Sequence, residues 1–339
     1  MTMKPKNSES NQVEIDYQSY KPVPDYVHEA ISEHLAIELE DAKTAGALGY
    51  MTRALVMASL PYKDPKSDTF SRTNGDFKLR IVAGYEGGIP YGVYPRILTS
   101  WVVTEAVRTQ SPIIHLGDSL NMFLRDVIKV RSQSGGKRGT STRVTEQMKR
   151  LFGALITAQY SGTLDKRGFI LKNVLLADEI NINEDEVNEC IWTPLKEQEI
   201  HNTSNWKSTI KLSTNFYKEC VDSPVPIDLR AYMELRSSPA AMDLYSWLTF
   251  RMSYLRKKSL PIPWEALMMQ FGTGLNKYGS GSNKKEISQG IRNFRTQFTK
   301  ALKLVTVVYK DVNVEIKENG LVLLPSPTHI PKTKFINVG

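Results

Sequence analysis

Two stretches of this chain repeat the same pattern of apolar and basic residues, and the repeat constrains the fold more than any single motif. Residues 95–158 and 241–304 each carry apolar positions at helical spacing, a basic loop rich in glycine and serine, and a long amphipathic segment. A shift of 146 residues places Ser100-Trp101 on Ser246-Trp247 and aligns the apolar positions around them. Each copy therefore predicts two helices, a loop and a third helix, as in a helix-turn-helix unit.

Strand-like segments follow the third helix of each copy. Residues 168–177 and 206–213 follow the first copy and flank an acidic stretch. Residues 312–316 and 321–324 follow the second copy and are joined by Glu318-Asn319-Gly320, a sequence typical of a hairpin turn. A β-hairpin after three helices is the order of a winged helix. We therefore predict an α+β fold, mainly α, built from two tandem winged-helix (helix-turn-helix-like) domains.

The length of 339 residues suits two domains of ordinary size. We place a flexible polar arm at 1–24, a first winged-helix domain at 25–222, a second at 223–328 and a C-terminal tail at 329–339. The first domain opens with a predicted helix at 25–59, because apolar residues recur there at helical spacing. Two interpretations of this helix stay open: it packs on the first domain, or it mediates a homodimer.

The other local predictions rest on caps, turn residues and periodicity. In chain order they are a strand at 77–82, turns at 84–92, a helix at 96–109 after Pro95, a short strand at 113–116, a helix capped by Asp118 or Ser119, a loop at 131–139, a helix at 140–160, a helix at 239–257 capped by Ser238, a short helix from Pro263 to Gly272, and a helix at 285–308.

Positive charge is concentrated in the third helix of each copy and in the residues just before it. The chain has a net charge of +8, of which residues 137–150 contribute +4 and residues 284–303 contribute +5. The rest of the chain is therefore close to neutral, at about −1. Such a distribution favours an anionic partner that meets these two segments.

Each third helix has an apolar stripe and a polar face. The stripes are Val144, Met148, Leu151, Phe152 and Leu155 in the first copy, and Ile287, Ile291, Phe294, Phe298 and Leu302 in the second. One basic helix face alone is usually only solvated surface, but two at equivalent places in a repeat favour double-stranded DNA, whose base edges and phosphates such side chains bind. The predicted DNA-binding residues are Lys137, Arg138, Thr140, Ser141, Thr142, Arg143, Glu146, Gln147, Lys149 and Arg150 in the first copy, and Lys284, Lys285, Ser288, Gln289, Arg292, Asn293, Arg295, Thr296 and Lys300 in the second.

Motifs for catalysis, metal binding and membranes are missing from the sequence. The chain has two cysteines and five scattered histidines, and Gly135-Gly136-Lys137-Arg138 lacks the spacing and the hydroxyl of a phosphate-binding loop. We interpret the acidic residues between 178 and 189 as a solvated loop. We expect no enzymatic activity, no cofactor and no metal. The absence of an 18-residue apolar run and of a signal sequence predicts a cytoplasmic protein without membrane contact.

Nine short blocks identify a resemblance to a family that covers roughly residues 45–328. They are Leu-Pro-Tyr-Lys-Asp-Pro (60–65), Arg-Thr-Asn-Gly (72–75), Ile-Pro-Tyr-Gly (89–92), Thr-Glu-Ala-Val-Arg-Thr (104–109), Leu-Gly-Asp-Ser-Leu (116–120), Asp-Leu-Tyr-Ser-Trp-Leu (243–248), Ile-Pro-Trp (262–264), Gln-Phe-Gly (270–272) and Leu-Pro-Ser-Pro (324–327). Together they resemble the RepA-type, iteron-binding plasmid replication initiators. We interpret blocks 72–75 and 89–92 as turn-forming structure.

The resemblance implies two winged-helix domains that bind repeated sites (iterons) in a plasmid origin. It further implies that the protein promotes opening of the origin and recruits the host initiator and the replicative helicase. Many related initiators bind iterons as monomers and repress their own promoter as homodimers. A DNA-binding transcriptional repressor without initiator activity is the alternative, because both functions use the same DNA-contacting helices.

Overall fold

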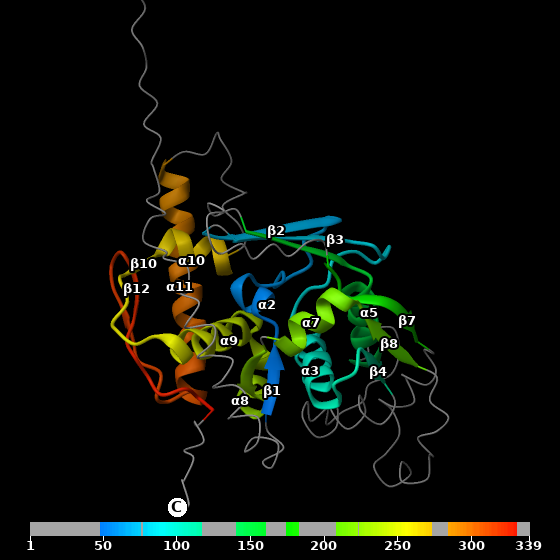
Figure 1. Ribbon diagram of the computed structural model, residues 1–339. Coiled ribbons are helices and arrows are strands. Elements are labelled where there is room, and N and C mark those ends of the chain that lie inside the picture. Colours follow the sequence, from blue (N-terminus) through cyan, green and yellow to red (C-terminus); the bar gives the residue numbers. More distant parts are fainter. Residues whose placement is uncertain are drawn as a thin grey trace, which may run out of the picture.

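The computed structural model describes residues 48–75, 77–116, 140–160, 174–182, 208–222, 224–272 and 284–330. These residues form helices and four small antiparallel sheets, which confirms a mixed α+β fold (Figure 1). None of the described helices is both long enough and apolar enough to span a membrane.

The first helix of the first copy forms as predicted. It is α3, Val93–Thr109, in which Pro95 lies in the first turn and Trp101 is fully buried. The predicted strand that follows is β4, Ile113–His115. The helix expected after Asp118 and the loop at 131–139 lie outside the described residues.

The third helix of the first copy is shorter than predicted. This helix, α5, spans Thr140–Phe152, and the segment predicted as its last two turns is a strand, β5, Leu155–Tyr160. The helix ends where Gly153 packs closely on the loop that contains Tyr85, since a Cβ at this position would lie 3.1 Å from Tyr85 Cβ. The same Cβ would also lie 2.8 Å from the Lys149 carbonyl oxygen in the last turn of α5 itself. Leu155 continued the helical spacing of the sequence, so periodicity alone could not locate this end.

Strand β5 is part of a four-stranded sheet of order β2-β3-β5-β6. The other strands are β2, Thr69–Asn74; β3, Phe77–Val82; and β6, Val174–Leu175. The alternation predicted for 77–82 is confirmed, because Phe77, Leu79 and Ile81 are buried while Lys78 and Arg80 are exposed. The hairpin between β2 and β3 turns at Gly75, whose φ of +56° suits glycine.

A second sheet has the order β4-β8-β7, with β7 at Ala177–Asn181 and β8 at Thr209–Leu212. Strand β8 confirms the centre of the strand predicted at 206–213. Of the strand predicted at 168–177, residues 168–173 lie outside the described residues, and the remainder falls in β6 and at the start of β7. The acidic stretch begins inside β7 rather than in a loop, because Asp178 and Glu179 are exposed residues of that strand. Helix α7, Thr214–Asp222, follows β8.

The described end of the predicted helix at 25–59 is not helical as a whole. Residues 25–47 lie outside the described residues, and the rest forms β1, Leu48–Met51, and a short helix α2, Arg53–Met57. Strand β1 pairs antiparallel with β9, Val225–Asp228. The prediction was wrong here because a strand buried on both faces shows no alternation, so its apolar residues also matched helical spacing.

The second copy follows its prediction closely. Its elements and the hairpin after it are α9, Pro239–Tyr254; β10, Ile262–Pro263; α10, Trp264–Phe271; α11, Lys284–Val308; β11, Val314–Ile316; and β12, Gly320–Leu323. Two short helices that were not predicted precede it, α8, Leu229–Glu234, and a 3-10 helix, η5, Leu235–Ser237. Ser238 caps α9 by accepting a hydrogen bond from the Ala241 amide at 3.3 Å. The predicted hairpin is confirmed as β11–β12, and β10 joins it in the order β10-β12-β11.

The two copies share one hydrophobic core. Helices α3 and α9 contact each other, and the β1–β9 pair joins residues from either side of the predicted boundary at 223. The residues near 329 also pack on the fold, because His329 Nδ1 lies 2.7 Å from the Tyr245 hydroxyl and its ring contacts Tyr309. The predicted boundary at 222/223 therefore divides the two units along the sequence but does not divide the core, which contains residues from both sides of it.

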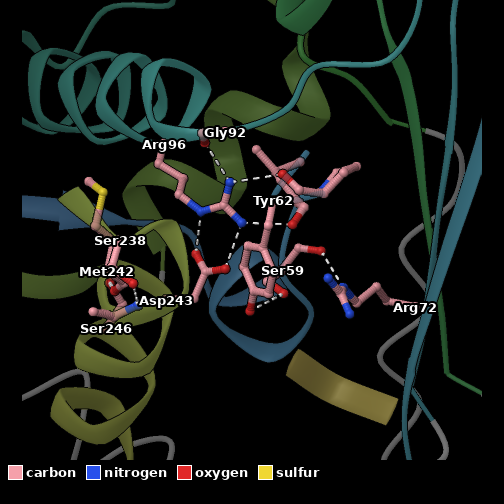
Figure 2. A network of polar contacts seen from close by, with 12 residues as sticks. Ser59, Tyr62, Arg72, Gly92, Arg96, Ser238, Met242, Asp243 and Ser246 are labelled. Atoms are coloured by element: carbon pink, nitrogen blue, oxygen red, sulfur yellow. Dashed lines mark hydrogen bonds and ion pairs between the residues drawn. The ribbon is translucent and has the colours of Figure 1, made fainter. Parts of the chain in front are cut away.

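A buried ion pair joins the two copies at their first helices (Figure 2). Arg96 of α3 and Asp243 of α9 are 1% and 7% exposed, and Arg96 donates two hydrogen bonds of 2.7 Å to the carboxylate. Arg96 also donates to the carbonyl oxygens of Leu60, Pro61 and Gly92, at 2.7, 3.2 and 2.6 Å. Burial alone would lower the pKa of Arg96, but the charge of Asp243 and its hydrogen bonds outweigh it, so the pKa is raised.

Asp243→Asn is expected to lower the free energy of unfolding by about 3–5 kcal/mol, because it leaves the buried Arg96 charge without a counterion. Urea unfolding followed by circular dichroism measures this loss. Glu105→Gln is the matched control, since its pair with Arg108 is 60% exposed at the arginine and is worth about 0–1 kcal/mol. Equal small losses in the two variants would contradict the structural role given to the buried pair.

Candidate nucleic-acid interface

Helix α11 is anchored by its aromatic stripe. Phe294 and Phe298 are buried, and the Phe298 ring makes edge contacts with the Trp264 and Phe271 rings of α10 at centroid distances of 5.8 Å. The stripe predicted from the sequence is therefore the packed face of the helix, although Ile287 and Ile291 near the N-terminal end are only half-buried. The opposite face of the same half is exposed.

Three side chains on this exposed face form a hydrogen-bonded ladder. Arg292 donates to the Gln289 side-chain oxygen at 2.8 Å, and Gln289 donates to the Asn293 side-chain oxygen at 2.9 Å. All three residues are exposed, as is Thr296 one turn further on. The four residues lie at spacing i, i+3, i+4 and i+7, so they form one strip along the helix.

The other predicted residues of α11 flank this strip. Lys284, Lys285, Ser288 and Lys300 are exposed. Arg295 differs from them, because it is half-buried and its guanidinium lies 5.2 Å from the centroid of the Trp264 ring. This cation–π contact is within the chain itself, so Arg295 supports the packing of α11 on α10.

Helix α5 exposes a smaller polar surface than the sequence predicted. Thr142 and Arg143 are exposed in its first turn. Lys149 is half-buried near the end of the helix. Thr140 and Ser141 belong to the first turn of α5, but their side chains are not described. Lys137 and Arg138 lie outside the described residues.

Three further residues predicted to bind DNA from α5 have partners inside the chain. Arg150 is only 13% exposed and donates to Glu146 at 2.9 Å, with Asp64 4.0 Å away and the Tyr91 ring centroid 5.2 Å from its guanidinium. Gln147 is 6% exposed, and its side-chain oxygen accepts a hydrogen bond of 2.9 Å from the Tyr91 amide. The polar side of α5 therefore packs on loop 84–92.

The pKa shifts where α5 packs on loop 84–92 and Asp64 agree with contacts of Glu146 and Arg150 inside the chain. Tyr85 donates to Glu146 at 3.4 Å, and burial together with the Glu146 charge raises the pKa of Tyr85. Burial alone would raise the pKa of Asp64, but hydrogen bonds from Lys66 and the nearby charges of Lys66 and Arg150 outweigh it and lower that pKa. The Asp64 carboxylate is thus held in its charged form beside Arg150.

The block at 89–92 supports both α3 and α5. Gly92 has a φ of +80° and offers its carbonyl oxygen to Arg96 of α3. Tyr91 beside it contacts Gln147 and Arg150 of α5. The turn at this block therefore brings the beginning of one helix against the polar side of the other, which fits the turn-forming interpretation.

The block at 72–75 also has a structural role. Arg72 is buried at 3% exposure and donates to the Ser59 carbonyl oxygen at 3.0 Å (Figure 2). Gly75 at the end of the block forms the turn between β2 and β3. Both blocks were identified from the family resemblance. No periodicity or spacing in the sequence indicates which residues Arg72 or Tyr91 contact.

In the described part of the chain, no three His, Cys, Asp or Glu side chains gather in a group that could hold a metal ion. The exposed polar strip of α11 and the first turn of α5 are the candidate surfaces for a nucleic-acid partner, because their polar side chains are exposed. Both offer guanidinium and hydroxyl groups, and the strip adds amides, of the kind that bind base edges and phosphates.

Comparison with known proteins tests the resemblance seen in the sequence. The model of the family described as plasmid encoded RepA protein matches residues 89–265, just over half of the chain, from the loop before α3 to the start of α10. No curated protein and no solved structure matches the chain. The expected resemblance is confirmed, and this chain belongs to the family of plasmid-encoded RepA proteins.

Proposed function

We propose that the protein is a replication initiator that binds repeated double-stranded sites in the origin of its plasmid. The hydrogen-bonded strip on α11 is the observation that carries this proposal, because it presents base-binding groups on a rigid, well-anchored helix. Membership of the RepA family supports a role in plasmid replication.

The order of elements supports two winged-helix units. In the second, α9, α10 and α11 precede the β11–β12 hairpin, and β10 between the first two helices completes a three-stranded sheet. In the first, α3 and α5 precede β5 and β6, which pair antiparallel. A helix-turn-helix unit places its recognition helix in the major groove, so α11 and α5 are the proposed DNA-contacting helices.

The proposed contacts follow from side-chain chemistry. Arg292 bonds the O6 and N7 atoms of guanine, Gln289 and Asn293 bond the N6 and N7 atoms of adenine, and the methyl group of Thr296 meets that of thymine. Lysines at both ends of the strip bind phosphates and set the register. The ladder fixes three polar side chains before DNA arrives, which reduces the entropy lost on binding.

Helix α5 supplies the second, smaller contact through Thr142 and Arg143. Two modules on one duplex raise the overall affinity without either being strong alone. The proposed interface omits four of the residues predicted from the sequence, because their side chains already bind other residues of the chain. These four are Glu146, Gln147, Arg150 and Arg295.

We propose that the protein acts on plasmid DNA in the bacterial cytoplasm and that it has no enzymatic activity and no cofactor. The host initiator and the replicative helicase are its proposed protein partners, and a homodimer is the proposed form for repression of its own promoter. Opening of the origin then follows from the bound repeats and the recruited host proteins.

A footprint on DNA flanking the gene, taken across a salt series, tests the proposal directly. We expect several equally spaced protected sites whose protection falls steeply as salt rises, because counterion release contributes a slope of about −0.9 per phosphate. Maintenance of a reporter plasmid carrying the same DNA then tests initiation. A single protected palindrome with no plasmid maintenance would contradict the proposal, and so would a footprint with no protection.

Arg292→Ala should weaken binding to the protected sites by about 1–3 kcal/mol while leaving binding to random duplex DNA nearly unchanged, because a base contact is lost. Fluorescence anisotropy on the two duplexes measures the difference. Lys310→Ala is the control, since Lys310 is exposed beyond the end of α11. A loss of the same size on both duplexes would show that Arg292 contacts only phosphate.

Arg143→Ala and Arg150→Ala are expected to differ, although both remove one positive charge from α5. Arg143→Ala should reduce the salt slope by about 0.9 without changing stability, because an exposed phosphate contact is lost. Arg150→Ala should lower the free energy of unfolding by about 1–3 kcal/mol, because its charged hydrogen bond to Glu146 is lost. Anisotropy across a salt series and urea unfolding separate the two effects, and an unchanged stability of the Arg150 variant would return Arg150 to the interface.

A further inference from the structure

The four-stranded sheet has an outer face that carries positive charge and hydroxyl groups. Alternate residues of a strand share a face, and the register places Thr73 beside Lys78 and Ser71 beside Arg80. Thr157 of β5 lies on the other side of Arg80. Both cations thus have hydroxyl-bearing residues beside them on the neighbouring strands.

The cations of this face are available to a partner. Lys78 and Arg80 are exposed, and within the described part of the chain neither makes an ion pair or a hydrogen bond through its side chain. The residues that alternate with them on β3 point to the other face, where Phe77, Leu79 and Ile81 are buried. Figure 1 shows helices on that inner side of the sheet, so the outer face is the one left uncovered by the labelled helices.

We propose that this outer face binds the phosphate backbone of duplex DNA without regard to sequence. The described side chains of this face include no carboxylate that would repel a phosphate, while lysine, arginine and hydroxyl groups are the usual phosphate contacts. The proposal rests on the proposed function, since the same duplex is the ligand. The described outer-face side chains on β2, β3 and β5 are Thr69, Ser71, Thr73, Lys78, Arg80, Val82, Leu155 and Thr157.

Duplex rather than single-stranded DNA fits the composition of the face. Proteins that hold single strands stack bases on aromatic rings, and none of the described outer-face side chains is aromatic. Lys78 and Arg80 are two residues apart, or about 7 Å along the strand, so each can meet its own phosphate.

The position of the sheet allows one duplex to reach both surfaces. Strand β2 contacts α10, and α10 in turn packs against α11. Figure 1 shows the N-terminal half of α11 and the sheet at the same end of the molecule. DNA held by the strip on α11 can therefore continue over the sheet, where contacts to phosphates add affinity and leave the choice of sequence to α11.

Lys78→Ala/Arg80→Ala in the full-length protein tests the proposal by fluorescence anisotropy on three probes: duplex DNA flanking the gene, a random duplex and a random single strand. We expect the affinity for both duplexes to fall by the same factor and the salt slope to drop by about 1.8, because two phosphate contacts are lost.

Two control variants accompany this measurement. Lys211→Ala/Lys218→Ala removes the same charge from exposed residues of β8 and α7. Its salt slope should stay within about 0.5 of the wild type, less than the change from one phosphate contact. Lys78→Arg/Arg80→Lys preserves the charge of the sheet face and should keep the wild-type slope.

Three results would overturn the proposal. An unchanged slope in the Lys78→Ala/Arg80→Ala variant, with normal urea unfolding, would show that no phosphate is bound there. An equal loss in the Lys211→Ala/Lys218→Ala variant would reduce the effect to net charge. A loss confined to the single-stranded probe would assign the face to a different form of DNA.

Failure of this proposal can be told from failure of the proposed function. If the Lys78→Ala/Arg80→Ala variant keeps the slope while Arg292→Ala removes discrimination between the two duplexes, only the sheet proposal fails. If the wild-type protein does not discriminate between the duplexes but the sheet variant loses slope on both, the sheet proposal stands and the site-specific function fails.

Discussion

The buried pair of Arg96 and Asp243 fixes how the two copies of the repeat meet. Arg96 has five N–H groups, and each has an acceptor: two on the Asp243 carboxylate and one each on Leu60, Pro61 and Gly92. Two charges withdrawn from water are tolerated only when their hydrogen bonds are complete. A shift of α3 against α9 would leave a buried donor unpaired, so the pair selects one arrangement of these helices.

The same pair is connected to the two helices proposed to contact DNA, α5 and α11, because it binds carbonyl groups of the segments that support them. Gly92 ends the loop whose Tyr91 holds the polar side of α5. Leu60 follows Ser59, whose hydroxyl donates to the Gln270 carbonyl oxygen of α10 at 3.3 Å. Helix α10 in turn packs on the aromatic stripe of α11. The pair thus connects both helices through short chains of contact.

Local signals explain which elements the sequence predicted. The cap of α9, the proline and glycine that bound α10, the long amphipathic pattern of α11 and the turn between β11 and β12 lie within a few residues of the structure they determine, and all were found. The end of α5 and the pair β1–β9 depend on contacts with distant segments, and periodicity missed them.

The same distinction between local and distant determinants applies to the candidate site. The exposed face of α11 could be predicted because its helix alone defines it, whereas Arg150 and Gln147 of α5 are occupied by loop 84–92 and Asp64, which no helical pattern reveals.

If the protein binds DNA as proposed, contacts within the chain rather than net charge decide which cations are available to it. The net charge of +8 counts every arginine equally, yet several guanidiniums contact carbonyls, carboxylates or rings of the protein itself, namely those of Arg72, Arg96, Arg150 and Arg295. Releasing any of them to a phosphate would break a contact already made, so their gain on binding is small. Arg143, Lys78 and Arg80 are exposed and make no side-chain contact of this kind within the described part of the chain, so in the proposed complex their phosphate contacts account for affinity and its salt dependence. In the same proposed complex, sequence preference depends on the strip of α11, where hydrogen bonds hold polar groups together while they stay exposed.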